Sequence, residues 1–156
     1  MFANLTREQC LDYISCSNPI STMSARTKEA KQLEKINRAE RLLTTIAVLE
    51  QQIRDIKASG EIAPTGCHLA RYQARGQYKA YWYYKLQAKQ AIFPSKKESG
   101  KLSRYQHLGA AGTESHVQGV MMVIRRNQID ELQKSIDALR DSWSDLYSDL
   151  EEQKKS

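Results

Sequence analysis

The stretch CHLARYQARGQYKAYWYYKL, residues 67–86, decides the fold class, because it predicts a β-hairpin in a chain that is otherwise helical. Residues 67–75 and 78–86 have the composition of two strands, and they flank a glycine-containing turn at Arg75-Gly76-Gln77. The second strand is dense in tyrosine and tryptophan, which favour extended backbone. A loop and then a third strand at 102–108 follow, so we expect the hairpin to be part of a three-stranded antiparallel sheet.

Successive side chains of a strand point to opposite faces, so the hairpin is expected to have two chemically different faces. The apolar face, expected to pack on the helices, collects Ala70, Tyr72, Ala74, Tyr78, Ala80, Trp82, Tyr84 and Leu86. The basic and aromatic face, expected to face water, collects Arg71, Gln73, Arg75, Lys79, Tyr81, Tyr83 and Lys85. Residues 69–76 and 102–109 match at five of eight positions, which would place Arg104 with Arg71 on the open face.

The segments on either side of the hairpin carry heptad spacing. The seam before it consists of Ala39, Leu42, Ile46, Leu49, Ile53 and Ile56. The seam after it consists of Ile129, Leu132, Ile136, Leu139, Trp143, Leu146 and Leu150. A single amphipathic helix is marginal in water, so both seams must be buried. An antiparallel pair within the chain would bury them, and so would a parallel pair between two chains, which would make a homodimer.

The chain is therefore predicted to be α+β: a long antiparallel helical hairpin, or coiled-coil stem, that carries a three-stranded antiparallel β-sheet. The predicted regions are 1–22, a short N-terminal helix and linker; 23–60, a coiled-coil helix; 61–113, a basic, tyrosine-rich β module; and 114–156, a C-terminal coiled-coil helix. Ser115 and Gln118 have the spacing of a capping box, so the last helix is expected to begin at about Ser115.

The positive charge of the chain is concentrated in the β module. The formal net charge is +6, yet residues 66–108 hold nine basic residues and one acidic residue, a local charge of +8. The remainder of the chain therefore carries −2. A uniformly basic chain can owe its charge to solubility alone, whereas a basic island in a near-neutral chain favours a surface with a specific function.

An open sheet face of Arg, Lys, Gln and Tyr suits nucleic acid, because cations neutralise phosphates while tyrosines stack on bases. Arg and Gln can also contact base edges, and a narrow ribbon of strands can enter a major groove. Solvent faces of sheets are normally polar and edge lysines oppose aggregation, so a plain solvated face is the alternative interpretation. The residues predicted to bind nucleic acid, with DNA favoured over RNA, are Arg71, Gln73, Arg75, Lys79, Tyr81, Tyr83, Lys85, Lys96, Lys97, Lys101 and Arg104.

The hairpin and the residues after it also resemble two groups of proteins. The run YWYYKL at 81–86, then LSRYQHLG at 102–109 and a long helix, is similar to small basic cyanobacterial proteins of unassigned function. Over about residues 64–140 the chain also resembles the three-stranded DNA-binding modules attached to recombinases and integrases of mobile elements. That resemblance implies an accessory or regulatory DNA-binding role, with contacts from Arg71, Arg75, Lys79, Tyr81 and Lys85.

Other classes of function have little support in the sequence. The three cysteines and three histidines show no metal-ligand spacing, and no nucleophile–base pair or glycine-rich phosphate loop is marked. We therefore expect a non-enzymatic protein without cofactor, metal or small-molecule substrate. No long apolar run or signal segment is seen, which predicts a cytoplasmic protein without membrane contact. The alternative function is a coiled-coil interaction or assembly protein whose β module docks an acidic protein partner.

Overall fold

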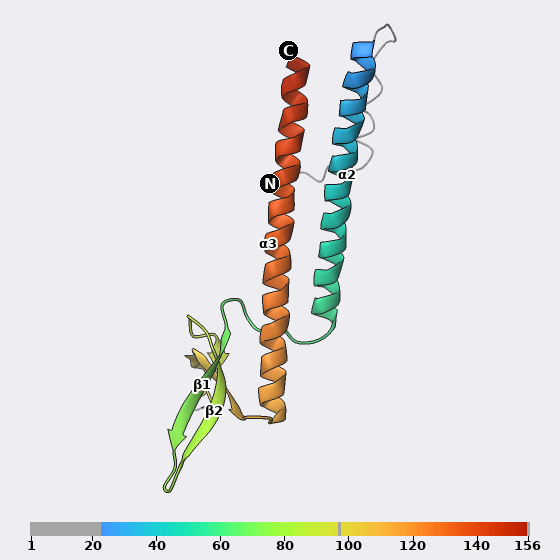
Figure 1. The fold of residues 1–156 in the computed structure, drawn as a ribbon. Coiled ribbons are helices and arrows are strands. Elements are labelled where there is room, and N and C mark those ends of the chain that lie inside the picture. Colours follow the sequence, from blue (N-terminus) through green and yellow to red (C-terminus); the bar gives the residue numbers. More distant parts are fainter. Residues whose placement is uncertain (1–22, 97, 156) are drawn as a thin grey trace. The chain divides into compact units, whose positions relative to one another are not determined.

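The structure, a computed structural model, describes residues 23–96 and 98–155 of the chain. The helix predicted within residues 1–22 lies outside the described residues. The elements are, in chain order, α2 (Met23–Ala58), β1 (His68–Arg75), β2 (Ala80–Gln87), β3 (Phe93–Pro94), β4 (Leu102–Ser103), β5 (Tyr105–Ala110) and α3 (Glu114–Lys155). The two helices and the three-stranded antiparallel sheet confirm the α+β prediction (Figure 1).

The chain divides within α2 into two units, Met1–Arg38 and Ala39–Ser156. The described part of the first unit is helical, and its Leu33 side chain is exposed. The second unit holds the rest of α2, the strands and α3, together with two clusters of buried side chains. The hairpin and the elements that position it therefore belong to the second unit.

The main sheet has the strand order β1-β2-β5, so β2 is the central strand and runs antiparallel to both neighbours. β3 and β4 form a separate pair of two residues each. The single third strand predicted at 102–108 is wrong, because the chain bends at Arg104 between β4 and β5, and β5 continues to Ala110. The two halves have different partners: Ser103 pairs with Phe93, whereas Tyr105 pairs with β2.

The main sheet lies beside the first turns of α3 (Figure 1). One buried cluster of side chains joins the sheet to this part of the helix. Its members are Ala63, Cys67, Leu86, Ala88, Phe93 and Leu108. Met122 and Val123 of α3 pack against it. The helix approaches β5 closely at Gly119, where a Cβ atom would lie 2.5 Å from Cδ1 of Leu108. α3 therefore covers the face of the sheet that carries Leu86.

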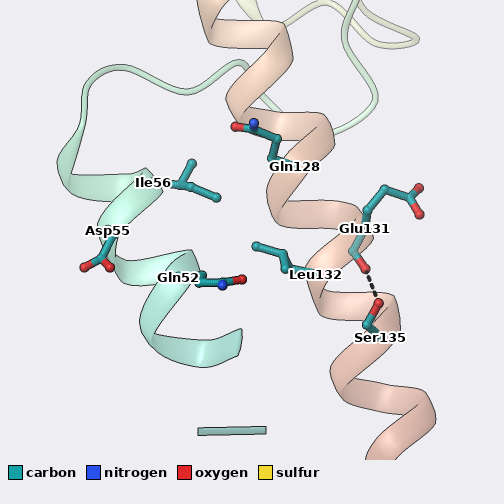
Figure 2. A pocket seen from close by; sticks show the side chains of 7 residues that line it. All are labelled: Gln52, Asp55, Ile56, Gln128, Glu131, Leu132 and Ser135. Carbon is teal, nitrogen blue, oxygen red and sulfur yellow. Dashed lines mark hydrogen bonds between the residues drawn. The ribbon is translucent and has the colours of Figure 1, made fainter. Parts of the chain in front are cut away.

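A second buried cluster joins α2 to α3. Ile46 and Ile53 of α2 meet Ile129 and Ile136 of α3. The heptad residues packed against this cluster are Leu49, Ile56, Leu132 and Leu139. Beside it, a shallow groove between the helices is lined by Gln52, Asp55, Ile56, Gln128, Glu131, Leu132 and Ser135 (Figure 2). Side chains at predicted seam positions thus account for this contact between the helices.

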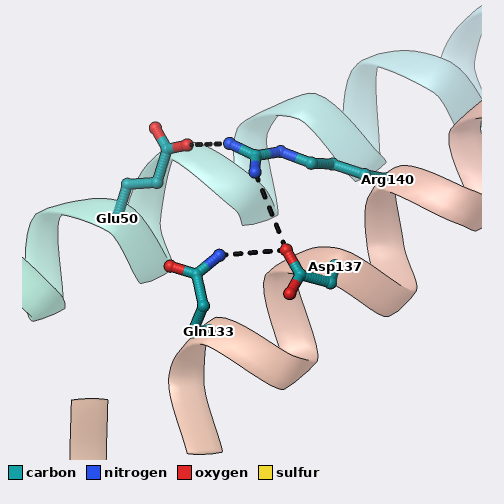
Figure 3. A network of polar contacts seen from close by, with 4 residues as sticks. All are labelled: Glu50, Gln133, Asp137 and Arg140. Carbon is teal, nitrogen blue, oxygen red and sulfur yellow. Dashed lines mark hydrogen bonds and ion pairs between the residues drawn. The ribbon is translucent and has the colours of Figure 1, made fainter. Parts of the chain in front are cut away.

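Polar contacts border the same helix pair (Figure 3). Arg140 donates to a carboxylate oxygen of Glu50 at 2.8 Å and lies 3.8 Å from a carboxylate oxygen of Asp137. Gln133 donates to Asp137 at 2.9 Å. Exposed pairs of this kind contribute about 0–1 kcal/mol each, so the buried isoleucines hold the helices together more than the charges do.

Two arginines of α3 bind the linker that leads from α2 to the sheet. Arg125 donates to the Ser59 hydroxyl and to the Glu61 carbonyl oxygen, both at 3.1 Å. The Nε of Arg126 donates to the carbonyl oxygen of buried Ala63 at 2.8 Å. The Ala63 amide donates in turn to the Met122 carbonyl oxygen at 3.1 Å. These bonds fix the entry of the chain into the sheet.

The residue that caps the N-terminus of α3 is not the predicted one. The helix begins at Glu114, and the hydroxyl of Thr113 accepts the amide hydrogen of His116 at 3.3 Å. Thr113 is therefore the N-cap residue, since its side chain binds the amide three residues on. Ser115 lies inside the first turn, so the capping box predicted from Ser115 and Gln118 is wrong.

Candidate nucleic-acid interface

The register of the β1–β2 hairpin determines which side chains share a face. Arg75 pairs with Ala80, Arg71 with Tyr84 and Leu69 with Leu86. Four residues, 76–79, connect the paired ends, and the Gly76 amide donates to the Lys79 carbonyl oxygen at 2.8 Å. Directly opposite residues point to the same side of a sheet, so this register assigns every side chain of the hairpin to a face.

The predicted faces are wrong, because they pair the two strands one residue out of register. A one-residue slip transfers all side chains of one strand to the other face. The inner face, on the side of the buried cluster, carries Leu69, Arg71, Gln73, Arg75, Ala80, Trp82, Tyr84 and Leu86. The outer face carries Ala70, Tyr72, Ala74, Tyr81, Tyr83, Lys85, Tyr105 and His107. The predicted binding residues are thus divided between both faces.

The inner face changes from core to surface along its length. Leu86 is fully buried, and the Tyr84 ring lies 4.1 Å from the His116 ring of α3, measured between centroids. Further toward the turn, the Arg71 guanidinium carbon lies 4.0 Å from the centroid of the Trp82 ring. Trp82 is 48% exposed, although it was predicted to pack on the helices. The distal inner face therefore presents an arginine stacked on an open indole, with Arg75 beyond it.

The outer face holds a cluster of aromatic rings around one lysine. Tyr72 and Tyr83 are cross-strand partners, and their rings stack with centroids 5.9 Å apart. The ammonium of Lys85 lies 3.9 Å from the centroid of the Tyr105 ring and 5.3 Å from that of Tyr72. The Tyr72 hydroxyl and Nδ1 of His107 form a hydrogen bond of 2.9 Å. A cation held over aromatic faces in this way is stabilised without a carboxylate.

The turn of the hairpin is exposed. Tyr78, predicted to pack on the helices, lies in the turn and is 91% exposed. The Lys79 ammonium lies 5.1 Å from the centroid of the Tyr81 ring, which is 44% exposed. The turn therefore presents a cation beside two open aromatic rings.

The remaining predicted residues lie outside the hairpin. Lys96 is exposed after β3, and exposed Lys101 forms an ion pair with Glu98. The guanidinium carbon of Arg104 lies 5.9 Å from the Tyr105 ring centroid, at the border of the outer face. Lys97 lies outside the described residues. Of the three described residues of this group, Arg104 alone is brought to the cluster on the outer face.

The hairpin cations are not neutralised by acidic neighbours. Among the residues that the structure describes, no ion pair involves Arg71, Arg75, Lys79 or Lys85. All four side chains are exposed or half-buried. A cation that is not paired with a carboxylate produces a positive electrostatic potential in the surrounding solvent. The hairpin therefore presents positive potential on both faces and at its turn.

Sequence reasoning missed Tyr105 and His107 as members of the outer face. Both lie on β5 at alternate positions, opposite Gln87 and Lys85 respectively. The similarity between residues 69–76 and 102–109 drew attention to Arg104 instead, which lies at a bend rather than in a strand. One signal for the true register was present: pairing Leu69 with Leu86 puts partly buried Leu69 against the cluster that holds Leu86, whereas the predicted faces leave Leu69 in water.

Within the described ranges 23–96 and 98–155, no group of three or more His, Cys, Asp or Glu residues could hold a metal ion. Neither described helix has an apolar stretch of the length required to cross a bilayer.

Cys67 is buried, and burial raises the pKa of its thiol. No protein-family model, curated protein or solved structure matches the chain. Its function is therefore inferred from the chemistry of the hairpin.

Proposed function

We propose that the protein binds nucleic acid through the β1–β2 hairpin, with DNA favoured over RNA, as a non-enzymatic accessory or regulatory protein. The observation that carries this proposal is the combination of unneutralised cations and exposed aromatic rings on one hairpin. Phosphates exchange their condensed counter-ions for such cations, and the release of those ions favours binding. The aromatic rings add contacts to bases or sugars that charge alone does not provide.

The cations are divided between the two faces of the hairpin. This distribution supports a mode of binding in which the hairpin contacts phosphates on both sides. Arg71 and Arg75 belong to the inner face, Lys85 to the outer face, and Lys79 to the turn. A ribbon with charge on one face would lie on a nucleic acid from one side. A ribbon with charge on both faces can meet phosphates on either side when it enters a groove or is wrapped by a flexible strand.

We further propose that α2 and α3 form an antiparallel coiled coil within one chain. The buried cluster of Ile46, Ile53, Ile129 and Ile136, at heptad spacing in each helix, supports this arrangement. Light scattering after size-exclusion chromatography should then give the mass of a monomer at micromolar concentration. A dimer whose mass is halved by Ile136→Lys would favour the parallel intermolecular pair and the assembly function instead.

The test of nucleic-acid binding compares two triple variants that lose the same charge. Arg71→Ala/Arg75→Ala/Lys79→Ala removes three hairpin cations, whereas Lys57→Ala/Lys134→Ala/Arg140→Ala removes three helix cations. Fluorescence anisotropy with labelled DNA and RNA at several salt concentrations gives the affinity and its salt dependence. Each lost phosphate contact should lower the slope of log affinity against log salt by roughly one.

The hairpin variant is expected to bind more weakly and with a shallower salt dependence by about two to three units, while the helix variant keeps the wild-type slope. Equal losses in both variants would indicate only a response to net charge. If the wild-type protein binds no nucleic acid at low salt, the proposal is wrong. An acidic protein partner of the hairpin then becomes the leading alternative.

A further inference from the structure

The outer face contains aromatic rings that the cores do not require. Among the described residues, the two buried clusters and the hydrophobic side chains packed against them do not include Tyr72, Tyr81, Tyr83 or Tyr105. α3 covers the opposite face of the sheet, which carries Leu86. A solvent-facing sheet surface is ordinarily polar, whereas this face presents four tyrosines that neither core covers.

The cross-strand pairs alternate large and small side chains along the outer face. Ala74 lies opposite Tyr81, Tyr72 opposite Tyr83, and Ala70 opposite Lys85. An alanine beside a tyrosine leaves the face of the larger ring open on that side. Tyr81 is accordingly 44% exposed, and half-buried Tyr83 lies two residues further along the same strand. The rings form a row along β2, along which successive flat groups could stack.

Cations lie at the end of this row nearest to β5. The Lys85 ammonium lies over the rings of Tyr72 and Tyr105, and the Arg104 guanidinium carbon lies 5.9 Å from the centroid of the Tyr105 ring. Lys79 lies near Tyr81 at the opposite end. A surface of rings with a cation at each end matches the chemistry of a single nucleic-acid strand, in which flat bases alternate with a phosphate backbone.

We propose that the outer face binds an unpaired stretch of nucleic acid, with successive bases stacked on Tyr81 and Tyr83 and phosphates bound by Lys79 and Lys85. This inference rests on the proposed function and names its ligand class. The bases of a duplex are stacked on each other, so a row of side-chain rings cannot reach their faces without opening the pairs. Base identity has little effect on stacking, so the binding is sequence-tolerant.

The experiment uses oligonucleotides that differ in bases but not in charge. A twelve-residue thymidine strand is compared with a strand of the same length in which the six central positions are abasic. Both carry the same phosphates, so electrostatic attraction is equal and only stacking differs. The wild-type protein should bind the intact strand at least about tenfold more tightly, because stacking of one or more bases is lost in the abasic strand.

Substitutions at the same two rings show where the preference arises. Tyr81→Leu/Tyr83→Leu should bind the intact and the abasic strand with nearly equal affinity. The conservative variant Tyr81→Phe/Tyr83→Phe keeps the rings and should keep the preference. Circular dichroism checks that each variant is folded, and Tyr81→Leu alone serves if the double leucine variant is not, because Tyr81 is exposed and belongs to neither core.

The outcomes separate this inference from the proposed function. Equal affinity of the wild-type protein for intact and abasic strands, with a salt dependence that the hairpin cations determine, would overturn base stacking and leave nucleic-acid binding in place. Tighter binding to a duplex of the same length than to the intact strand would also overturn it. Absence of binding to every nucleic acid at low salt would overturn both proposals together.

Discussion

The guanidinium of Arg71 lies over the indole of Trp82 on the inner face of the hairpin, 4.0 Å from the ring centroid. Arg71 is two residues along β1 from Gln73, the direct partner of Trp82, so the contact is diagonal across the two strands. Neither side chain belongs to the buried cluster, although Tyr84, the direct partner of Arg71, packs against it. This contact therefore links β1 to β2 on the inner face, opposite the outer face on which the proposed strand of nucleic acid binds.

The Arg71–Trp82 contact should be measurable as a coupling free energy. In a double-mutant cycle with Arg71→Ala and Trp82→Leu, we expect the free energies of unfolding to deviate from additivity by about 0.5–1 kcal/mol, the usual strength of an exposed cation–π contact. Urea denaturation measures it. The matched cycle uses Arg75→Ala, an arginine of the same face, and should show additivity within about 0.5 kcal/mol. Additivity in both cycles would mean that the contact contributes nothing to stability.

Removal of the Arg126 side chain should destabilise the protein. Its Nε binds the carbonyl oxygen of Ala63, a residue that is fully buried. Arg126→Met leaves that oxygen without the guanidinium donor, which is expected to lower the free energy of unfolding by about 1–3 kcal/mol. Arg140→Met removes an exposed arginine that pairs with Glu50, and it should cost no more than about 1 kcal/mol. Similar losses in both variants would contradict the structural role given to Arg126.

The close approach of α3 to β5 depends on a residue without a side chain. A Cβ at Gly119 would lie 2.5 Å and 2.9 Å from the two methyl carbons of buried Leu108. Gly119→Val should therefore lower the free energy of unfolding by about 1–3 kcal/mol through overpacking. Gln118→Val places the same residue at an exposed neighbouring position and should change stability by about 0.5 kcal/mol or less. A thermal or urea transition that is unchanged in Gly119→Val would show that the helix and strand can separate without cost.

The buried thiol of Cys67 should make stability and reactivity depend on pH. Burial raises the pKa of Cys67 in the folded protein, and the nearby Arg126 guanidinium lowers it in part. Because the folded state holds the proton more firmly, this contribution to stability is present below the ordinary thiol pKa and is lost as pH rises through the folded value. In a Cys10→Ser/Cys16→Ser background, alkylation of Cys67 should have a pH midpoint above that of a free cysteine.

A midpoint at or below that of free cysteine would mean that the thiolate is stabilised, and the expected fall in stability at alkaline pH should then be absent. The Cys10→Ser/Cys16→Ser/Cys67→Ala variant removes the titrating group. In this variant, the free energy of unfolding should decrease less between neutral and alkaline pH than it does when Cys67 is present. Urea unfolding at neutral and alkaline pH measures both effects.

The helices and the strands could be located from the sequence because their signals are local. Heptad spacing predicted the residues that join α2 and α3, and Ile46, Ile53, Ile129 and Ile136 are buried together. The density of aromatic residues around Tyr83 predicted β2. The bend at Arg104 was not predicted, because it depends on the pairing of Ser103 with Phe93, a contact across an irregular loop.

The composition of each face could not be predicted, because it depends on how two strands are aligned. The predicted faces place Arg75 and Lys79 on the same side of the hairpin, whereas the direct partner of Arg75 is Ala80. The difference of one residue moves Tyr81 and Tyr83 away from Arg71 and Arg75. The charged residues were identified from the sequence. Their distribution over two faces depends on the pairing of Leu69 with Leu86, which puts both leucines on the side of the buried cluster.

The anchoring of Leu69 and Leu86 at the base of the hairpin has a consequence for how such a protein can change over time. Both leucines are held on the inner side near α3, so the alignment of the strands is set far from the turn. Residues 76–79 belong to no strand, and all four are exposed. Insertions or deletions in the turn can therefore lengthen or shorten the hairpin during evolution, and so adapt it to a new target. The pairing of the strands near α3 would be inherited unchanged.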